Sequence, residues 1–172
     1  PGAVDRVPAM PRLPRPPRPA PSVIETSVEI DAPVERVFRF HLDTRNAPLV
    51  SPPDSRIVKV DGTFPVTEGC EVRLVMRQKP LPRPIAWVLR VEAVIPNKAL
   101  VDVAVRSPFP SWRHEHRFEA LGRNRTRLTD RVTYTLPGGP LGPVVDRLLV
   151  RRMLRKAFAQ RHANTKALLE RR

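Results

Sequence analysis

Two histidines and an aspartate are the residues whose types and spacing best suit chemistry. His114 and His116 lie in segment 112–120, Asp130 lies in segment 125–136, and polar and apolar residues alternate along both. Because the charged side chains of 112–120 share one face, both histidines are expected on the other, apolar face. An imidazole beside a carboxylate on that face can donate a hydrogen bond or act as a general acid or base.

The loop between the two segments predicts which side chains meet. A three-residue loop over 122–124 places His116 opposite Asp130 and His114 opposite Val132. The other pairs in this register are Phe118 with Leu128 and Trp112 with Tyr134. Either Asp130 satisfies His116 and holds the hairpin in register, which the sequence favours, or it fixes the tautomer of an imidazole that acts on a ligand. His114 has no evident carboxylate opposite it and is therefore the better candidate for a ligand contact.

A metal site is a further interpretation of the same histidines. His-x-His on a strand is a spacing that metal ligands use, and the third ligand would have to be His41 or Asp130. The sequence favours proton transfer or hydrogen bonding instead, so neither a metal nor a cofactor is expected. The single cysteine, Cys70, has no evident basic neighbour and is expected to be an inert buried thiol.

The segments that position these residues are strands first and a helix last. Alternating patterns predict seven strands, over 23–30, 56–60, 70–78, 85–95, 100–105, 112–120 and 125–136. Short turns between them favour an antiparallel sheet. Asp31 as an N-cap and Pro33 in the first turn predict a helix after the first strand, and a short second helix is expected over 43–49.

From residue 141 onward the apolar residues recur with the period of a helix. Its residues form two stripes that point in nearly opposite directions: Leu141, Val145, Leu148 and Leu149, then Met153, Leu154, Ala157, Phe158 and Leu168. The helix is therefore expected either to bend or split near 149–152 or to be apolar on both sides at its start. Both interpretations fit a helix that faces a sheet along one part of its length and a cavity along another.

Three stretches of the chain resemble START-like domains, also called the SRPBCC superfamily. The stretch 30–38, IDAPVERVF, is similar to their opening. Residues 112–119 with 126–134 resemble the last hairpin of the bacterial polyketide cyclase/dehydrase-like and coenzyme Q-binding-protein branch, and 136–142 is similar to the lead into its final helix. The resemblance implies an α+β helix-grip fold, with a seven-stranded curved antiparallel sheet around a long C-terminal helix and two short helices after strand 1. It also implies an elongated cavity between sheet and helix, usually without a metal or a covalent nucleophile.

A curved sheet that holds one long helix cannot fill its interior completely, so a void of about 300–1,000 Å³ is expected. Its predicted apolar wall is Trp87, Leu89, Val91, Val103, Trp112, Phe118 and Tyr134, with Phe38 and Met76 as additions, and His114 and His116 complete the candidate ligand-binding residues. Along segment 85–95, inward-facing residues are expected to alternate strictly with outward-facing ones, so that Ile95 also faces inward.

Three functions compete on these grounds. The favoured one is a non-catalytic protein that binds and carries a hydrophobic small molecule such as a lipid, a quinone or a polyketide. The alternative is an aromatase/cyclase- or dehydratase-type enzyme in which His114, His116 and Asp130 transfer protons. The third is binding to an anionic membrane surface through the basic C-terminal helix, where residues 146–172 hold nine basic and two acidic residues.

Composition limits the remaining possibilities. The net charge of +14 favours anionic partners, but the chain has no helix-turn-helix or RNA-binding signature and only 5% aromatic residues, so nucleic acid is not favoured. Residues 1–22 hold eight prolines and are predicted to be a disordered Pro/Arg-rich tail, with residues 23–172 forming one ligand-binding domain. The lack of a secretory signal, of a spanning segment and of paired cysteines predicts a cytoplasmic protein, with peripheral membrane contact as the alternative.

Overall fold

Seven strands form one antiparallel sheet in the order β1-β7-β6-β5-β4-β3-β2. The computed structural model describes residues 20–137 and 142–171, so most of the predicted 1–22 tail lies outside the described residues. The strands are β1 (Ser22–Ile30), β2 (Ser55–Asp61), β3 (Glu71–Gln78), β4 (Ile85–Ile95), β5 (Ala99–Arg106), β6 (Ser111–Gly122) and β7 (Arg125–Thr135). All seven predicted strands are therefore present.

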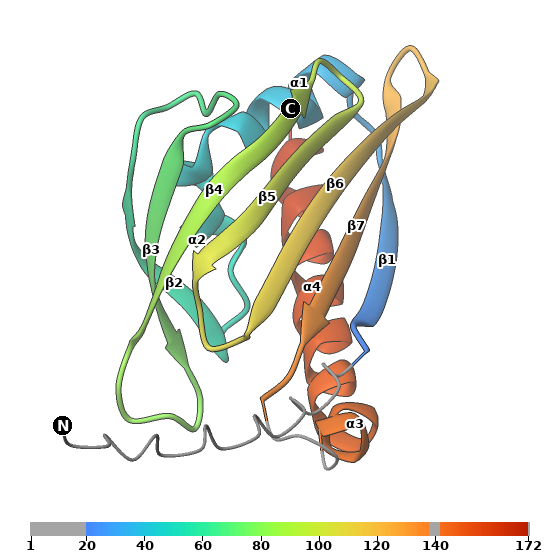
Figure 1. Ribbon diagram of the computed structural model, residues 1–172. Coiled ribbons are helices and arrows are strands. Elements are labelled where there is room, and N and C mark those ends of the chain that lie inside the picture. The colour runs from blue at the N-terminus through green and yellow to red at the C-terminus, as the bar shows by residue number, and fades with distance from the viewer. Residues whose placement is uncertain (1–19, 138–141, 172) are drawn as a thin grey trace, which may run out of the picture.

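Helices occupy the two places where the sequence predicts them. After β1 come α1 (Val34–Leu42), the 3-10 turn η1 (Thr44–Asn46) and α2 (Ala47–Val50). At the C-terminus come α3 (Gly142–Val145), the π-helical segment η3 (Asp146–Val150) and α4 (Arg151–Leu169). Figure 1 shows the sheet curving around α4, with α1 near one end. The predicted helix-grip architecture is confirmed.

Helix α1 begins later than its predicted cap. Its N-cap is Pro33, in an extended conformation with ψ 146°, and no side chain caps the helix. Asp31 instead donates its backbone N–H to Glu170 near the end of the chain. The prediction of Asp31 as the cap is wrong, because the extended Pro33 delays the first helical residue to Val34.

The hairpin of β6 and β7 has the predicted register. Trp112 pairs with Tyr134, His114 with Val132, His116 with Asp130 and Phe118 with Leu128. The loop differs from the prediction, since only Arg123 and Asn124 separate the strands and a register shift lies between Ala120 and Gly122. This β-bulge takes up the extra residue, so the pairs beyond it keep their partners.

On two strands, the residues that face inward differ from those that the sequence pattern predicts. On β5, Asp102 pairs with His114 and Leu100 with His116, so Val103 lies on the opposite face of the sheet, where its partner on β6 is Arg113. The prediction that Val103 faces the cavity is wrong, because the alternating valines of β5 form the outer face and the inner face carries a carboxylate. On β4 a register shift between Val91 and Ala93 ends the strict alternation, and Ile95 is exposed.

The two apolar stripes of the C-terminal helical region have different surroundings, and the change between them falls at η3. The second apolar stripe packs on the sheet, with Leu154 and Phe158 buried against Ile24 and Val132. Of the first stripe, Leu148 and Leu149 are exposed, at 72% and 63%. At Arg151 the geometry changes from π to α with helical backbone angles on both sides, so the helix does not split there, and these two side chains face solvent rather than a cavity. No helix among the described residues has the length and apolarity needed to cross a membrane.

Asp146 joins the start of this helical region to the sheet. Its buried carboxylate accepts a hydrogen bond from the Ser22 hydroxyl at 2.6 Å and another from the hydroxyl of the fully buried Tyr134, and the Arg151 guanidinium lies 3.4 Å away. The predicted cavity residue Tyr134 therefore links strand β7 to η3.

Replacing Tyr134 with Phe is expected to lower the free energy of unfolding by about 1–3 kcal/mol, because the buried Asp146 carboxylate loses a donor that water cannot easily replace. Urea unfolding followed by circular dichroism measures this loss. Ser111→Ala is the control, since it removes an exposed hydroxyl that bonds Thr135. A loss no larger than that of the control would contradict the structural role of the Tyr134 hydroxyl.

Candidate functional site

Two adjoining cavities lie between the sheet and α4. The larger has a volume of about 290 Å³ and the smaller about 80 Å³. The residues that line both are Ala47, Ile57, Leu74, Leu89, His114 and Arg161. His114 and Arg161 are the polar members of this shared set, so they stand at the junction of the two spaces.

The larger cavity is mostly apolar. Trp87, Phe109 and Trp112 form an aromatic group on its wall, with centroids of neighbouring rings 5.0–5.9 Å apart. Helix α4 contributes Met153, Leu154, Ala157 and Phe158 to the opposite wall, and β3 and β4 contribute Leu74, Met76, Ile85 and Leu89. The expected hollow between sheet and helix is present, with a volume just below the usual range of about 300–1,000 Å³ for ligand cavities.

The predicted wall residues divide into four groups. Met76, Trp87, Leu89, Trp112 and His114 line the larger cavity, and Val91 and His116 line the smaller one. Phe38, Phe118 and Tyr134 are buried in the packed core and line neither cavity. Val103 lies on the other face of the sheet, as described above. The ligand contacts of the first group stay a prediction.

All four histidines of the chain are buried in one cluster. His114 and His116 come from β6, His41 from the last turn of α1 and His162 from α4. The rings of His114 and His116 are 4.0 Å apart between centroids, and those of His41 and His116 are 5.1 Å apart. Three separate elements therefore place imidazoles around one part of the sheet.

Asp130 is the carboxylate at the centre of this cluster. His162 Nε2 is 2.8 Å from Asp130 Oδ2, while His116 Nδ1 and His114 Nε2 are 2.5 Å and 3.3 Å from Asp130 Oδ1. The predicted pair of His116 and Asp130 is thus part of a larger arrangement in which one carboxylate faces three imidazoles. Asp130 itself lines neither cavity.

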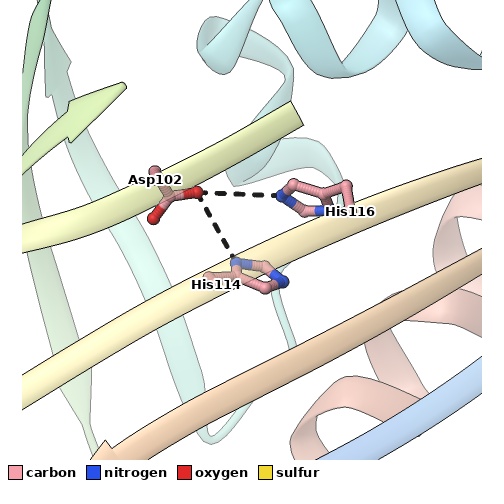
Figure 2. A group of neighbouring side chains, drawn as sticks. All are labelled: Asp102, His114 and His116. Carbon is pink, nitrogen blue, oxygen red and sulfur yellow. Dashed lines mark ion pairs between the residues drawn. The ribbon is translucent and has the colours of Figure 1, made fainter. Parts of the chain in front are cut away.

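Asp102 is a second carboxylate in contact range of the same histidines. Its Oδ2 lies 3.7 Å from His114 Nδ1 and 3.9 Å from His116 Nε2, as Figure 2 shows. The expectation that His114 has no carboxylate nearby is therefore wrong, because the neighbouring strand β5 supplies one directly across from it. The predicted third metal ligands, His41 and Asp130, are not part of this group of three donor atoms.

Burial dominates the protonation of the cluster. It lowers the pKa of His41 to about 3, and it also lowers the pKa of His114 and His116, with the neighbouring imidazole adding to the effect on His116. Burial opposes ionisation of Asp130, but the imidazoles of His116 and His114 outweigh it and hold the pKa of Asp130 well below 3.8. Neutral His41, His114 and His116 beside an ionised Asp130 are therefore expected at pH 7.

Burial raises the pKa of Asp102 to about 6. The folded protein then takes up this proton near pH 6, whereas the unfolded chain takes it up near pH 3.8. Protonation favours the folded state, so the contribution of Asp102 to stability falls as the pH rises between these two values and is least favourable above pH 6.

Asp102→Asn is expected to remove this pH dependence. Relative to the variant, the unmodified protein should lose on the order of 2 kcal/mol of unfolding free energy between about pH 4.5 and 7.5. Urea unfolding in EDTA at both pH values measures the difference, with Asp61→Asn at an exposed position as the control. An Asp102→Asn effect that is equal at the two pH values would show that this carboxyl is not perturbed.

Three residues of the site were not identified from the sequence. Asp102 lies on the inner alternation of β5 between Leu100 and Ala104, and the valine pattern on the other face obscured it. Arg161 and His162 belong to the inner side of α4, three and four residues after Phe158. Helical spacing from Phe158 was the available signal, but Arg161 was counted only as one of the nine basic residues of 146–172.

Comparisons with known proteins give a family and a set of structural neighbours. The family model described as polyketide cyclase / dehydrase and lipid transport matches residues 22–170. No match is found among curated proteins. The expected likeness to polyketide cyclase-like proteins is thus confirmed, while its coenzyme Q-binding part stays a prediction.

Solved structures of low sequence identity share the fold. The Zhui aromatase/cyclase from Streptomyces sp. R1128 is 19% identical with a TM-score of 0.72, over 88% of this chain and 95% of its own. The di-domain ARO/CYC StfQ of the steffimycin biosynthetic pathway is 15% identical with a TM-score of 0.71, over 88% of this chain and 52% of its own. Norcoclaurine synthase from Thalictrum flavum, in complex with dopamine and hydroxybenzaldehyde, is 12% identical with a TM-score of 0.63, over 88% of both chains. At these identities the likeness establishes the fold alone.

Proposed function

Because the chain belongs to the polyketide cyclase / dehydrase and lipid transport family, we propose that it binds an amphipathic small molecule with an aromatic or aliphatic body and one acidic or carbonyl end. The body occupies the larger cavity, and the polar end points to the junction with the smaller one. The observation that carries this proposal is the apolar cavity of about 290 Å³ with His114 and Arg161 at that junction.

The wall of the cavity supports an aromatic or similarly flat body. Trp87, Phe109 and Trp112 offer ring faces and edges on one side, and Phe158 offers another ring on α4. Stacked or edge-to-face contacts with such rings stabilise an aromatic guest beyond the burial of its surface. A volume near the lower limit of ligand cavities favours a compact guest of about two fused rings over a long, fully enclosed lipid chain.

Arg161 supports an oxygen-bearing end on the ligand. It lines both cavities, and among the described residues no carboxylate lies within ion-pair distance of its guanidinium. A guanidinium binds carboxylates, enolates and carbonyl oxygens through a planar set of donors. A ligand oxygen placed here would be bound by Arg161 and would lie beside His114.

Tryptophan fluorescence tests this function directly, because the two tryptophans of the chain, Trp87 and Trp112, both line the larger cavity. We expect saturable quenching by 2-naphthoate and 2-naphthol. Arg161→Met should weaken 2-naphthoate binding by about 10- to 100-fold, the usual value of a charge-assisted hydrogen bond. Binding of the neutral 2-methylnaphthalene should be unchanged in the same variant.

Arg155, six residues before Arg161 on the same helix, supplies a matched control for charge. It is exposed on α4 and lines neither cavity, so Arg155→Met should leave 2-naphthoate binding unaltered. If neither the naphthalene compounds nor palmitate nor a short-chain ubiquinone quenches the fluorescence saturably, the binding function is wrong. Equal losses in both arginine variants would instead indicate a general effect of charge.

Acid–base catalysis in the same cavity is a second candidate. His114 lines both cavities, and Asp102 beside it has a pKa raised to about 6 by burial, so proton transfer near neutral pH is available to a bound ligand. Asp130 would act as a positioning residue, since it lies behind the histidines. If His114→Ala no longer turns over an aromatic β-keto substrate but still binds 2-naphthoate, the result supports catalysis. If the variant and the unmodified protein turn over this substrate equally, catalysis by His114 is excluded.

Docking to an anionic membrane is a third candidate. Val144, Val145, Leu148 and Leu149 are exposed apolar residues that surround the exposed Arg147. Apolar side chains next to arginines are typical of helices that lie in a membrane interface. Binding to vesicles with anionic lipid, lost in Leu148→Glu and absent with zwitterionic vesicles, would support this function, and equal binding to both kinds of vesicle would not.

A further inference from the structure

We propose that Asp102, His114 and His116 form a binding site for one divalent transition-metal ion of the Zn²⁺ or Fe²⁺ class. The three residues each offer one donor atom, and these atoms lie within 4.8 Å of one another. Two imidazoles and one carboxylate with open positions are a ligand set that both metals use. This site goes beyond the proposed binding of an organic ligand and does not depend on it.

The position of Asp130 assigns the tautomers that a metal needs. Asp130 Oδ1 lies 2.5 Å from His116 Nδ1 and 3.3 Å from His114 Nε2, although neither contact has the geometry of a hydrogen bond. Because an ionised carboxylate this close favours a ring N–H over a lone pair, these two nitrogens carry the protons. The other ring nitrogens, His116 Nε2 and His114 Nδ1, are then left with lone pairs. Both of these nitrogens face Asp102 Oδ2. Three acceptor atoms therefore converge with no hydrogen available between them unless Asp102 is itself protonated.

The spacing favours a metal ion over a proton between these atoms. The separations from Asp102 Oδ2, 3.7 Å and 3.9 Å, are too long for a hydrogen bond. The centre of three atoms spaced in this way lies roughly 2.3 Å from each, close to the ~2.0–2.2 Å of metal bonds to imidazole nitrogen and carboxylate oxygen. A contraction of a few tenths of an ångström would complete the site.

The surroundings also suit a bound cation. Asp102 Oδ1 is buried and has no hydrogen-bond partner among the described residues. Asp102 and Asp130 together outweigh the single positive charge of Arg161, so the site as a whole attracts a divalent ion. A carboxylate beside the second ring nitrogen of both ligating histidines, as Asp130 is here, resembles the outer-shell arrangement that fixes ring orientation in metal sites. The adjoining cavity of about 80 Å³ leaves room for water or a ligand oxygen in an open position.

The proposal reverses the expectation that the chain holds no metal. The sequence provided only His41 and Asp130 as third ligands, and neither has the right position. His41 Nδ1 is 2.8 Å from the Val37 carbonyl and lies outside the group of three donors. Asp102 on the neighbouring strand is the ligand that was missing.

Metal uptake by the full chain, prepared without a polyhistidine tag, tests the site. We expect one Co²⁺ per chain, with visible absorption bands of a four- or five-coordinate site, and displacement of Co²⁺ by an equivalent of Zn²⁺. Asp102→Asn, which keeps the shape of the side chain, should weaken Co²⁺ binding by at least about 100-fold, since even outer-shell changes cost 10- to 100-fold. His116→Gln should do the same.

Two controls separate loss of the metal from loss of the fold. Asp61→Asn removes an exposed carboxylate, and Cys70→Ser removes the only thiol, so neither should change Co²⁺ binding. Circular dichroism should show Asp102→Asn folded, because the variant removes an unfavourable buried charge. A folded unmodified protein that takes up no Co²⁺ or Zn²⁺, or an Asp102→Asn variant that binds Co²⁺ as tightly, would overturn the proposal, whatever the result with naphthalene ligands.

Discussion

Asp130→Asn is expected to lower the free energy of unfolding by about 3–5 kcal/mol, the usual cost of removing one partner from a buried charged network. The amide would present donor hydrogens where three imidazoles, those of His114, His116 and His162, now approach a carboxylate. At least one of these rings would have to change its tautomer or leave its position. Urea unfolding followed by circular dichroism and tryptophan fluorescence measures the loss.

A loss of this size can exceed the stability of a small domain, so a milder variant accompanies it. His162→Gln removes one of the three imidazoles and should cost about 1–3 kcal/mol, the penalty for one unsatisfied buried group. Asp61→Asn, at an exposed position paired with Lys59, should change stability by no more than about 0.5 kcal/mol. Losses for Asp130→Asn and His162→Gln as small as for Asp61→Asn would show that the histidine cluster does not support the fold.

Ala157→Phe is expected to abolish binding of 2-naphthoate, with a loss of affinity of at least about 100-fold. Ala157 lies on α4 and lines the larger cavity opposite the aromatic group of Trp87, Phe109 and Trp112. A phenyl ring at this position would occupy much of a space of about 290 Å³ and leave no room for a ligand of two fused rings. Tryptophan quenching by 2-naphthoate measures the affinity, and urea unfolding should show a change of less than about 3 kcal/mol.

The same helix provides the control for this substitution. Ala159 lies two residues further along α4 and is exposed. Ala159→Phe adds the same group to the outer side of the helix, so it should leave 2-naphthoate binding unchanged. If Ala157→Phe binds 2-naphthoate with the affinity of Ala159→Phe, then the ligand does not occupy the cavity between the sheet and α4.

Local patterns were sufficient to predict the hairpin that carries the histidines. On β6 the charged residues occupy one face and leave His114 and His116 on the other, and the pairing with β7 follows once both inner faces are assigned. The final helix was equally clear, because its apolar residues recur with a helical period up to Leu169, where α4 ends. Regular alternation over many residues determines such features, and a single bulge at the loop did not disturb them.

The carboxylate on β5 could not be predicted by the same logic. A charged residue is normally placed on the solvated face of a strand, because burial of an unpaired charge is unfavourable. Asp102 is mostly buried all the same, with 14% of its side chain exposed, and His114 and His116 on the neighbouring strand lie beside it. Arg161 was missed for a related reason, because a basic residue among many others on a helix is usually solvated. Asp102 and Arg161 join the site only because the fold brings β5, β6 and α4 together.

The π-helical segment Asp146–Val150 also affects how the C-terminal region can vary between related chains. A π turn holds about one residue more than an α turn, and one residue corresponds to a rotation of about 100° in an α-helix. A deletion of one residue within Asp146–Val150 can therefore be taken up by conversion of the π turn to an α turn, which keeps the side chains that follow in phase with the sheet. The same deletion between Arg151 and Ala157, inside α4, would instead rotate Ala157 and Arg161 by about 100° and move them off the cavity wall.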